Sequence, residues 1–177
     1  MLSYLSASSE KSGLRVVDTI APDVWVRCER PTPDEKSLLV GLGIDEDVLS
    51  DALDPHEVPR VELSDGWTYF ITRIPDTDDE FNDFTTPILF ALGKQHTVTV
   101  SRDSLGRLWQ PFIDSTQVNM ADQAELFIAM IDETAKHYQR RVAVINRQMR
   151  AATSDVVKLS SKDIVVLTEY ERKLNDF

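Results

Sequence analysis

The chain has 177 residues, of which 42% are hydrophobic and 28% are charged, a composition typical of an ordinary folded protein with one good-sized core. Its 30 acidic residues outnumber its 19 lysines and arginines, and the formal net charge of −11 at pH 7 makes nucleic acid an unexpected partner, because the surface repels phosphate. The single cysteine, Cys28, excludes an intrachain disulfide and a zinc site built from several thiolates.

The first residues of the chain predict two strands followed by a helix. Met1–Gly13 is rich in serine, which predicts a frayed or adaptable start. The apolar segments Leu14–Ile20 and Val24–Glu29 predict two strands, because turn-forming residues separate them. A helix is then expected after Thr32, which forms an N-terminal capping box with Glu35.

The stretch Val48–Glu62 combines a short helix with a concentration of acids. Its apolar residues follow one helical face, at Val48, Leu49, Ala52 and Leu53. The opposite face carries three acids, Asp47, Asp51 and Asp54. Their charges repel one another and oppose the helix dipole, and Pro55 is expected to end the helix. Something cationic should lie nearby, and the pattern leaves open whether it is an arginine, a metal ion or only water.

Four strands are expected in the middle of the chain. Their apolar patterns place them at Pro59–Leu63, Trp67–Ile74, Pro87–Leu92 and Thr97–Ser101. Asp65-Gly66 predicts a tight turn between the first two. The second of the four has apolar residues on both faces, which is typical of an inner strand. The acidic segment Pro75–Asp83 is expected to be a loop.

The last third of the chain changes to helical periodicity. Leu105–Ile113 predicts a short helix, and a pattern of about thirty residues after Asn119 predicts a long one. A further helix is expected over Ser160–Leu174. The organisation is therefore an α/β domain over residues 1–115, followed by a long-helix hairpin over residues 116–177. No apolar run reaches the ~18–20 residues of a membrane span.

Asp54, His56 and Glu57 raise the alternative of a soluble metal-dependent hydrolase. Neighbours in an extended loop point apart, however, so at most two of the three could share one ion. A polar connection between helix and strand is the simpler interpretation. The sequence also shows no nucleophile elbow, phosphate-binding glycine loop or zinc-protease helix, so we do not expect an enzyme.

A series of short motifs runs in order through the chain. It begins with Gly43-Ile44, then Val48-Leu49 before Asp51-Ala52-Leu53, then Pro59-Arg60-Val61-Glu62. It continues with Tyr69–Arg73, Thr86-Pro87-Ile88, Thr97–Val100, and Ala124–Asp132 leading to Tyr138. Together these residues resemble the cytoplasmic domain of CorA-type divalent-cation channels, over roughly residues 24–177.

The resemblance implies a fold and an assembly. The fold would be an αβα sandwich with a mixed parallel and antiparallel sheet, followed by long C-terminal helices. The family's two membrane spans and its Gly-Met-Asn signature are absent from these 177 residues. The chain is therefore expected to be the truncated N-terminal cytoplasmic domain of a homopentameric channel, on the cytoplasmic side of the inner membrane, reaching the membrane only through the missing spans.

The resemblance also implies metal ligands. Asp51 matches the family's principal ligand for a regulatory Mg²⁺ that favours the closed channel, and Asp132 matches a helper. On periodicity alone Asp132 would be an exposed acid paired with Lys136. Because Mg²⁺ keeps several waters and takes one or two carboxylates, Asp51 alone would hold it weakly, and a neighbouring subunit must complete the site.

Two departures from the family's pattern argue against additional cation-binding features, and the ion itself stays open. Ser50 stands where relatives often carry an acid, which weakens any second metal site. Arginines replace the acids of many relatives on the far half of the long helix, at Arg140, Arg141, Arg147 and Arg150. Co²⁺ and Ni²⁺ are alternatives to Mg²⁺ within the family, and Zn²⁺ would indicate its zinc-transporting branch.

Overall fold

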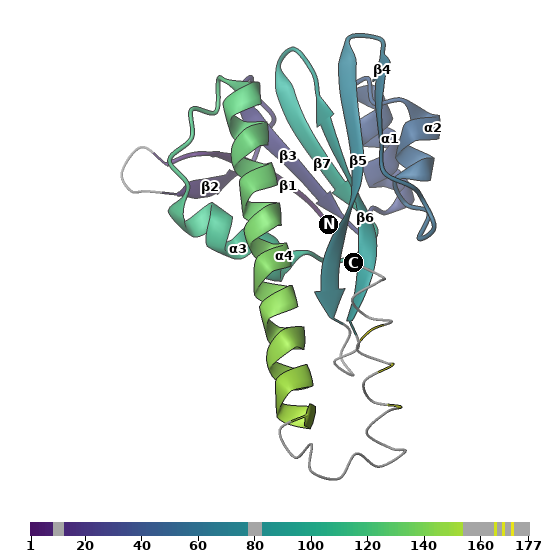
Figure 1. The fold of residues 1–177 in the computed structure, drawn as a ribbon. Coiled ribbons are helices and arrows are strands. Elements are labelled where there is room, and N and C mark those ends of the chain that lie inside the picture. The colour runs from purple at the N-terminus through teal and green to yellow at the C-terminus, as the bar shows by residue number, and fades with distance from the viewer. Residues whose placement is uncertain (9–12, 78–82, 154–164, 166–167, 169–170, 172–177) are drawn as a thin grey trace. The chain divides into compact units, whose positions relative to one another are not determined.

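A computed structural model describes residues 1–8, 13–77 and 83–153, together with residues 165, 168 and 171. Seven strands form one sheet in the order β2-β1-β3-β7-β6-β5-β4 (Figure 1). The strands are β1 Leu2–Ala7, β2 Leu14–Val17, β3 Val24–Glu29, β4 Arg60–Ser64, β5 Trp67–Thr77, β6 Asp83–Leu92 and β7 His96–Ser101. β3 and β7 are parallel, with Val26 opposite Val98, whereas β1 runs antiparallel to both of its neighbours. The predicted mixed sheet is confirmed.

Helices cover both faces of the sheet. α1 (Pro33–Gly41) and α2 (Glu46–Asp51) share a buried cluster with one face, which includes Val26 and Val98. α3 (Gly106–Ser115) and the first turns of α4 (Gln123–Thr153) share a second cluster with the other face, around Trp25. Alternate residues of β3 point to opposite faces, which is why neighbours along the strand enter different clusters. The predicted αβα sandwich is confirmed.

The start of the chain differs from the prediction of a frayed segment. Leu2–Ala7 forms β1, which lies between β2 and β3 and pairs with both. Leu5 is only 1% exposed and belongs to the cluster around Trp25. The serine-rich composition was a poor guide here. Hydrogen bonds to two flanking strands stabilise the extended conformation of this segment even though its own β-propensity is only moderate.

The helix starts follow the sequence closely. Thr32 caps α1 and Glu35 completes the predicted capping box. The side chain of Asp45 caps α2 by accepting hydrogen bonds from the backbone of Asp47 and Val48. Local side-chain oxygens satisfy the unpaired N–H groups of each first turn, which is why these starts could be predicted.

The end of α2 and the extent of β5 and β6 correct the prediction. α2 ends at Asp51, four residues before Pro55, so Asp54 is not part of the helix. β5 reaches Thr77 and β6 begins at Asp83, so both ends of the expected loop Pro75–Asp83 are strand, and residues 78–82 lie outside the described residues. The predicted Asp65-Gly66 turn is present, with φ of 49° and 84°, the left-handed conformation that a tight hairpin requires.

α4 runs as one helix for 31 residues, which confirms the predicted long helix. The expected helix Ser160–Leu174 lies almost wholly outside the described residues; Val165, Thr168 and Glu171 are helical. The chain divides into two compact units, one of Met1–Ile74 with Thr86–Thr134 and one of Pro75–Thr85 with Ala135–Phe177. The boundary expected at residue 115 stays a prediction. In the described part of the chain, no helix combines the length and apolar character needed to span a membrane.

Candidate functional site

Asp51 is the last residue of α2, and the helix holds its carboxylate at the molecular surface. Val48 and Leu49, on the opposite side of the helix, are each 2% exposed and anchor α2 against the sheet. The side chain of Asp51 is 48% exposed. A buried apolar face thus fixes the helix, and the same periodicity turns Asp51 outward.

Arg60, the first residue of β4, lies among three carboxylates. Its Nη2 atom donates to Oδ2 of Asp51 at 2.6 Å, and its Nε atom lies 3.4 Å from Oε2 of Glu62. Its Nη1 atom donates to Oε1 of Glu57. Each nitrogen of the guanidinium therefore contacts a different acid through a charge-assisted hydrogen bond, and none of the three acids forms a bidentate pair with it.

The pKa of Arg60 reflects this environment. Partial burial by itself lowers the pKa, but the hydrogen bonds to Asp51 and Glu62 and the charges of Glu57 and Asp51 outweigh it, so the pKa is raised above its usual value. Arg60 is therefore a permanent cation at the end of α2. The cation that the acidic stretch demanded is an arginine in this structure.

Hydrogen bonds between side chains and the loop backbone hold the connection from α2 to β4. Asp54 accepts a hydrogen bond from the backbone N–H of His56 at 2.8 Å. Arg73 on β5 donates to the carbonyl oxygens of Pro55 and Glu57, at 3.0 and 2.9 Å. The three residues of the hydrolase alternative do not converge: Asp54 binds backbone, Glu57 binds Arg60 and His56 is exposed. Within the described ranges, no three histidine, cysteine or acidic side chains are grouped to hold a metal ion.

Asp132 lies on the other face of the sheet from Asp51. It is an exposed residue of α4, which packs in the cluster around Trp25, whereas α2 packs in the opposite cluster (Figure 1). The two residues of one chain therefore cannot bind the same ion. The carboxylate of Asp51 is a donor type that suits Mg²⁺, but one carboxylate is not a full set of ligands for the ion.

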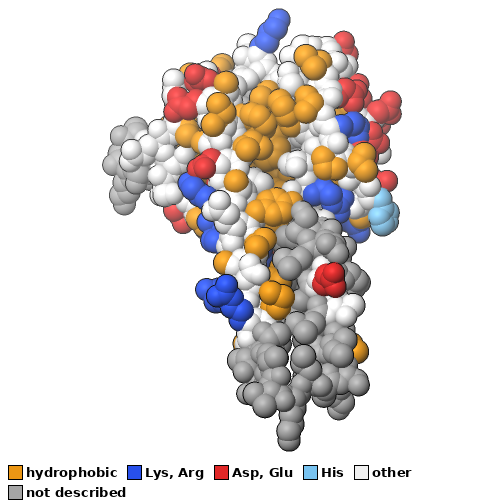
Figure 2. Space-filling model, viewed as in Figure 1, with side chains coloured by type: hydrophobic (Ala, Val, Ile, Leu, Met, Phe, Trp, Pro, Cys, Tyr) orange, Lys and Arg blue, Asp and Glu red, His pale blue; other side chains and the backbone are white. Residues whose placement is uncertain are grey.

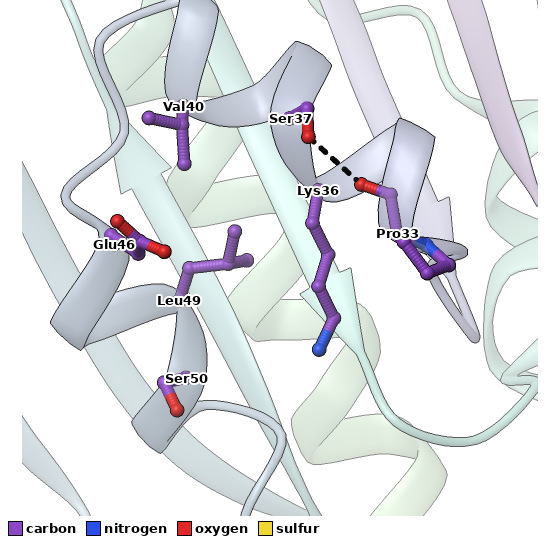
Figure 3. Close-up of a pocket in the computed structure, with 7 residues that line it drawn as sticks. All are labelled: Pro33, Lys36, Ser37, Val40, Glu46, Leu49 and Ser50. Atoms are coloured by element: carbon purple, nitrogen blue, oxygen red, sulfur yellow. Dashed lines mark hydrogen bonds between the residues drawn. The ribbon is translucent and has the colours of Figure 1, made fainter.

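Ser50 and Asp51 face different surroundings. Ser50 lines a groove of about 460 Å³ between α1 and α2, together with Lys36 and Glu46 (Figure 3). In Figure 2, acidic and basic side chains lie side by side along the right-hand margin, in the region where Figure 1 labels α2 and β4. Ser50 stands where relatives often carry an acid, and a serine adds no negative charge beside Asp51.

Sequence reasoning missed the role of Arg60. The acids required a cation, but Arg60 follows Asp51 by nine residues across two prolines. The path of that loop decides whether they meet, and periodicity carries no information about it. One signal could have indicated that Arg60 has an acidic partner. Arg60 is close to the start of the predicted strand, and Glu62, two residues later, lies on the same face of that strand.

The family described as CorA-like Mg2+ transporter protein matches residues 23–177, which is most of the chain. A search of curated proteins gives no match.

Solved structures share the fold at low sequence identity. The soluble domain of CorA from Methanocaldococcus jannaschii aligns with a TM-score of 0.80 at 18% identity, covering 98% of this chain and 71% of that one. The complete CorA of the same organism aligns with a TM-score of 0.78 at 18% identity, covering 100% of this chain. The cytoplasmic domain of ZntB from Vibrio parahaemolyticus RIMD 2210633 gives 0.72 at 14% identity, covering 99% of this chain and 73% of that one. The chain spans 58% of the length of the complete CorA.

Proposed function

Since the chain belongs to the CorA-like Mg2+ transporter family, we propose that it is the cytoplasmic, Mg²⁺-sensing domain of a divalent-cation channel. In this proposal it has no enzymatic role and regulates a pore that lies in a membrane. The observation that carries the proposal is the position of Asp51: a half-exposed carboxylate at the end of a rigidly packed helix. An outward acid on a fixed support is suited to binding a cation shared with a neighbouring molecule.

The position of Asp132 supports a site between subunits. Because Asp51 and Asp132 lie on opposite faces of the sheet, a ring of identical subunits could bring Asp51 of one copy near acids of the next. We propose a homopentamer with Mg²⁺ at such interfaces. Each copy carries a net charge of −11, so copies repel one another at neutral pH. A divalent cation bound at the interface would offset that repulsion and favour the closed arrangement.

The donor type favours Mg²⁺ over Zn²⁺. Asp51 offers carboxylate oxygen, which suits Mg²⁺, whereas Zn²⁺ prefers nitrogen and sulfur ligands. The buried Cys28 belongs to the cluster beneath α1 and α2, and burial raises the pKa of its thiol to about 11, so it is a poor thiolate donor. Co²⁺ and Ni²⁺ accept oxygen ligands as well, and we expect them to compete with Mg²⁺ at Asp51.

An Asp51→Asn substitution tests the proposal in the full-length protein. Mg²⁺ is expected to protect the wild type against thermal unfolding and proteolysis. The substitution keeps the shape of the side chain and removes its charge, so the Mg²⁺ concentration that gives half protection should rise on the order of tenfold, which corresponds to ~1.4 kcal/mol. The measurement is Tm, or the rate of proteolysis, as a function of Mg²⁺ at constant ionic strength.

Asp47→Asn is the matched control, because Asp47 is an exposed acid in the first turn of the same helix. It removes the same charge but should leave the Mg²⁺ response unchanged. A response that is equal in wild type and Asp51→Asn would reject Asp51 as the sensing ligand.

A further inference from the structure

We propose that Arg60 competes with the divalent cation for Asp51 and thereby sets the concentration at which the site fills. The inference rests on the proposed function, because it takes Asp51 to be a metal ligand. It assigns to Arg60 a role in metal affinity, although Arg60 is not itself a metal ligand. The effect follows from charge: an arginine bound to a carboxylate neutralises the group that a cation must use.

The contact between Arg60 and Asp51 is close. Nη2 and Oδ2 are 2.6 Å apart, which is a charge-assisted hydrogen bond. The side chain of Arg60 is 29% exposed, so bulk water screens the pair only in part. A cation that binds Oδ2 must displace the guanidinium, and one that binds the other oxygen still meets a positive charge next to it. Both routes weaken metal binding.

Glu57 and Glu62 make the exchange of partners feasible. They accept hydrogen bonds from Nη1 and Nε of Arg60, the two nitrogens that do not contact Asp51. When Asp51 turns to a metal ion, Arg60 therefore keeps two acidic partners. When the metal leaves, Asp51 regains a cation. Neither state contains an isolated charge, so the site can switch without the cost of an unpaired ion.

The exchange also changes the local structure. Asp51 is the last residue of α2 and Arg60 is the first residue of the edge strand β4. Their ion pair is a direct link between the two elements, and metal binding releases it. A merely structural ion pair would stabilise this link without any effect on metal affinity, and this difference makes the proposal testable.

The experiment measures the Mg²⁺ dissociation constant of the full-length protein by isothermal titration calorimetry. Arg60→Gln removes the competing charge and is expected to tighten Mg²⁺ binding by about three- to tenfold, as expected for loss of a partly screened unit charge next to the ion. Arg60→Met is a second neutral variant that keeps the apolar stem. Arg60→Lys keeps the charge and should stay near the wild type.

Lys36→Gln is the matched control, since Lys36 of α1 lines the groove between α1 and α2, and Arg60 does not line that groove (Figure 3). It removes one positive charge from the same helical layer and should change affinity by less than twofold. Equal tightening in Lys36→Gln and Arg60→Gln would overturn the competition, because general charge would then explain both.

Asp51→Asn separates the failure of the inference from the failure of the proposed function. If Asp51→Asn weakens Mg²⁺ binding but neither neutral variant of Arg60 tightens it, the competition is rejected and the proposed function stands. If Asp51→Asn leaves binding unchanged, or if none of the proteins binds Mg²⁺, both are rejected. Tightening in Arg60→Gln that disappears in the double variant with Asp51→Asn supports the inference.

Discussion

His137 is a buried histidine on α4, and its only described hydrogen-bond partner is a backbone carbonyl. It is 6% exposed, and its Nε2 atom lies 2.9 Å from the oxygen of Pro75. A carbonyl oxygen accepts only, so Nε2 carries the proton in this contact. Burial lowers the pKa of His137 below its ordinary value; Arg140 and Arg141 act in the same direction, and the bond to Pro75 and the charge of Asp76 oppose it.

Acidification is therefore expected to destabilise the protein through His137. The unfolded chain takes up a proton near pH 6.5, whereas the folded chain resists it until a lower pH. Stability from neutral His137 is full above about pH 6.5 and is lost as pH falls toward the folded pKa. Urea unfolding between about pH 7.5 and about pH 5.5 measures this loss.

His137→Gln should reduce the pH dependence of unfolding without abolishing it. Burial also lowers the pKa of His96, which leaves a residual slope. The same slope in wild type and His137→Gln would show that His137 does not contribute.

At the scale of elements, a side chain in the first turn of α1 connects this helix to β1. Oε2 of Glu35 accepts from the backbone N–H of Thr32 at 2.9 Å, and Oε1 accepts from that of Leu2 at 2.7 Å. These two backbone bonds lower the pKa of Glu35, with that from Thr32 the larger. One carboxylate thus closes the capping box of α1 and holds the first residue of β1.

Thr32→Ala is expected to destabilise the protein by about 1 kcal/mol, because it leaves the backbone N–H of Glu35 without its cap. Ser37→Ala on the same helix removes an exposed hydroxyl that donates to the carbonyl of Pro33, and should change stability by less than ~0.5 kcal/mol. The measurement is the free energy of unfolding in urea. Equal effects of the two variants would contradict a specific capping role.

At the scale of the whole molecule, charge dominates. The net charge of −11 at pH 7 produces self-repulsion that salt screens. NaCl is therefore expected to raise Tm at neutral pH. The increase should be smaller near the isoelectric point of about 4.7, where net charge vanishes. A Tm that is independent of NaCl at pH 7 would contradict a dominant role of net-charge repulsion.

One exposed apolar surface also belongs to this scale. Large hydrophobic side chains are exposed on β4 and α4, and Figure 2 shows hydrophobic side chains gathered on the face where Figure 1 has α4. The exposed hydrophobic residues on β4 are Val61 and Leu63, and those on α4 include Ile128 and Ile131. Val61 lies opposite Phe70, which stacks on Phe127 of α4. The surface of the sandwich therefore combines a large negative net charge with exposed hydrophobic side chains on β4 and α4.

Local patterns predicted most of the elements. The Thr32 cap, the Asp65-Gly66 turn and the strand Val24–Glu29 all appear where the residues placed them. The cap and the turn depend on contacts within a few residues, and the strand shows a largely apolar segment although its partners β1 and β7 are distant in the chain. β1 was not predicted, because its stability comes from two partner strands rather than from its own composition.

The sequence by itself determined the class of fold, the family and the need for a cation near Asp51, because periodicity, motif order and charge are properties of the chain. Only the tertiary structure decided that Arg60 meets this need and that Asp51 and Asp132 lie on opposite faces of the sheet. Both depend on how a loop and a sheet bring distant residues together or hold them apart. Electrostatic interaction falls with distance in space, and distance along the chain does not predict it.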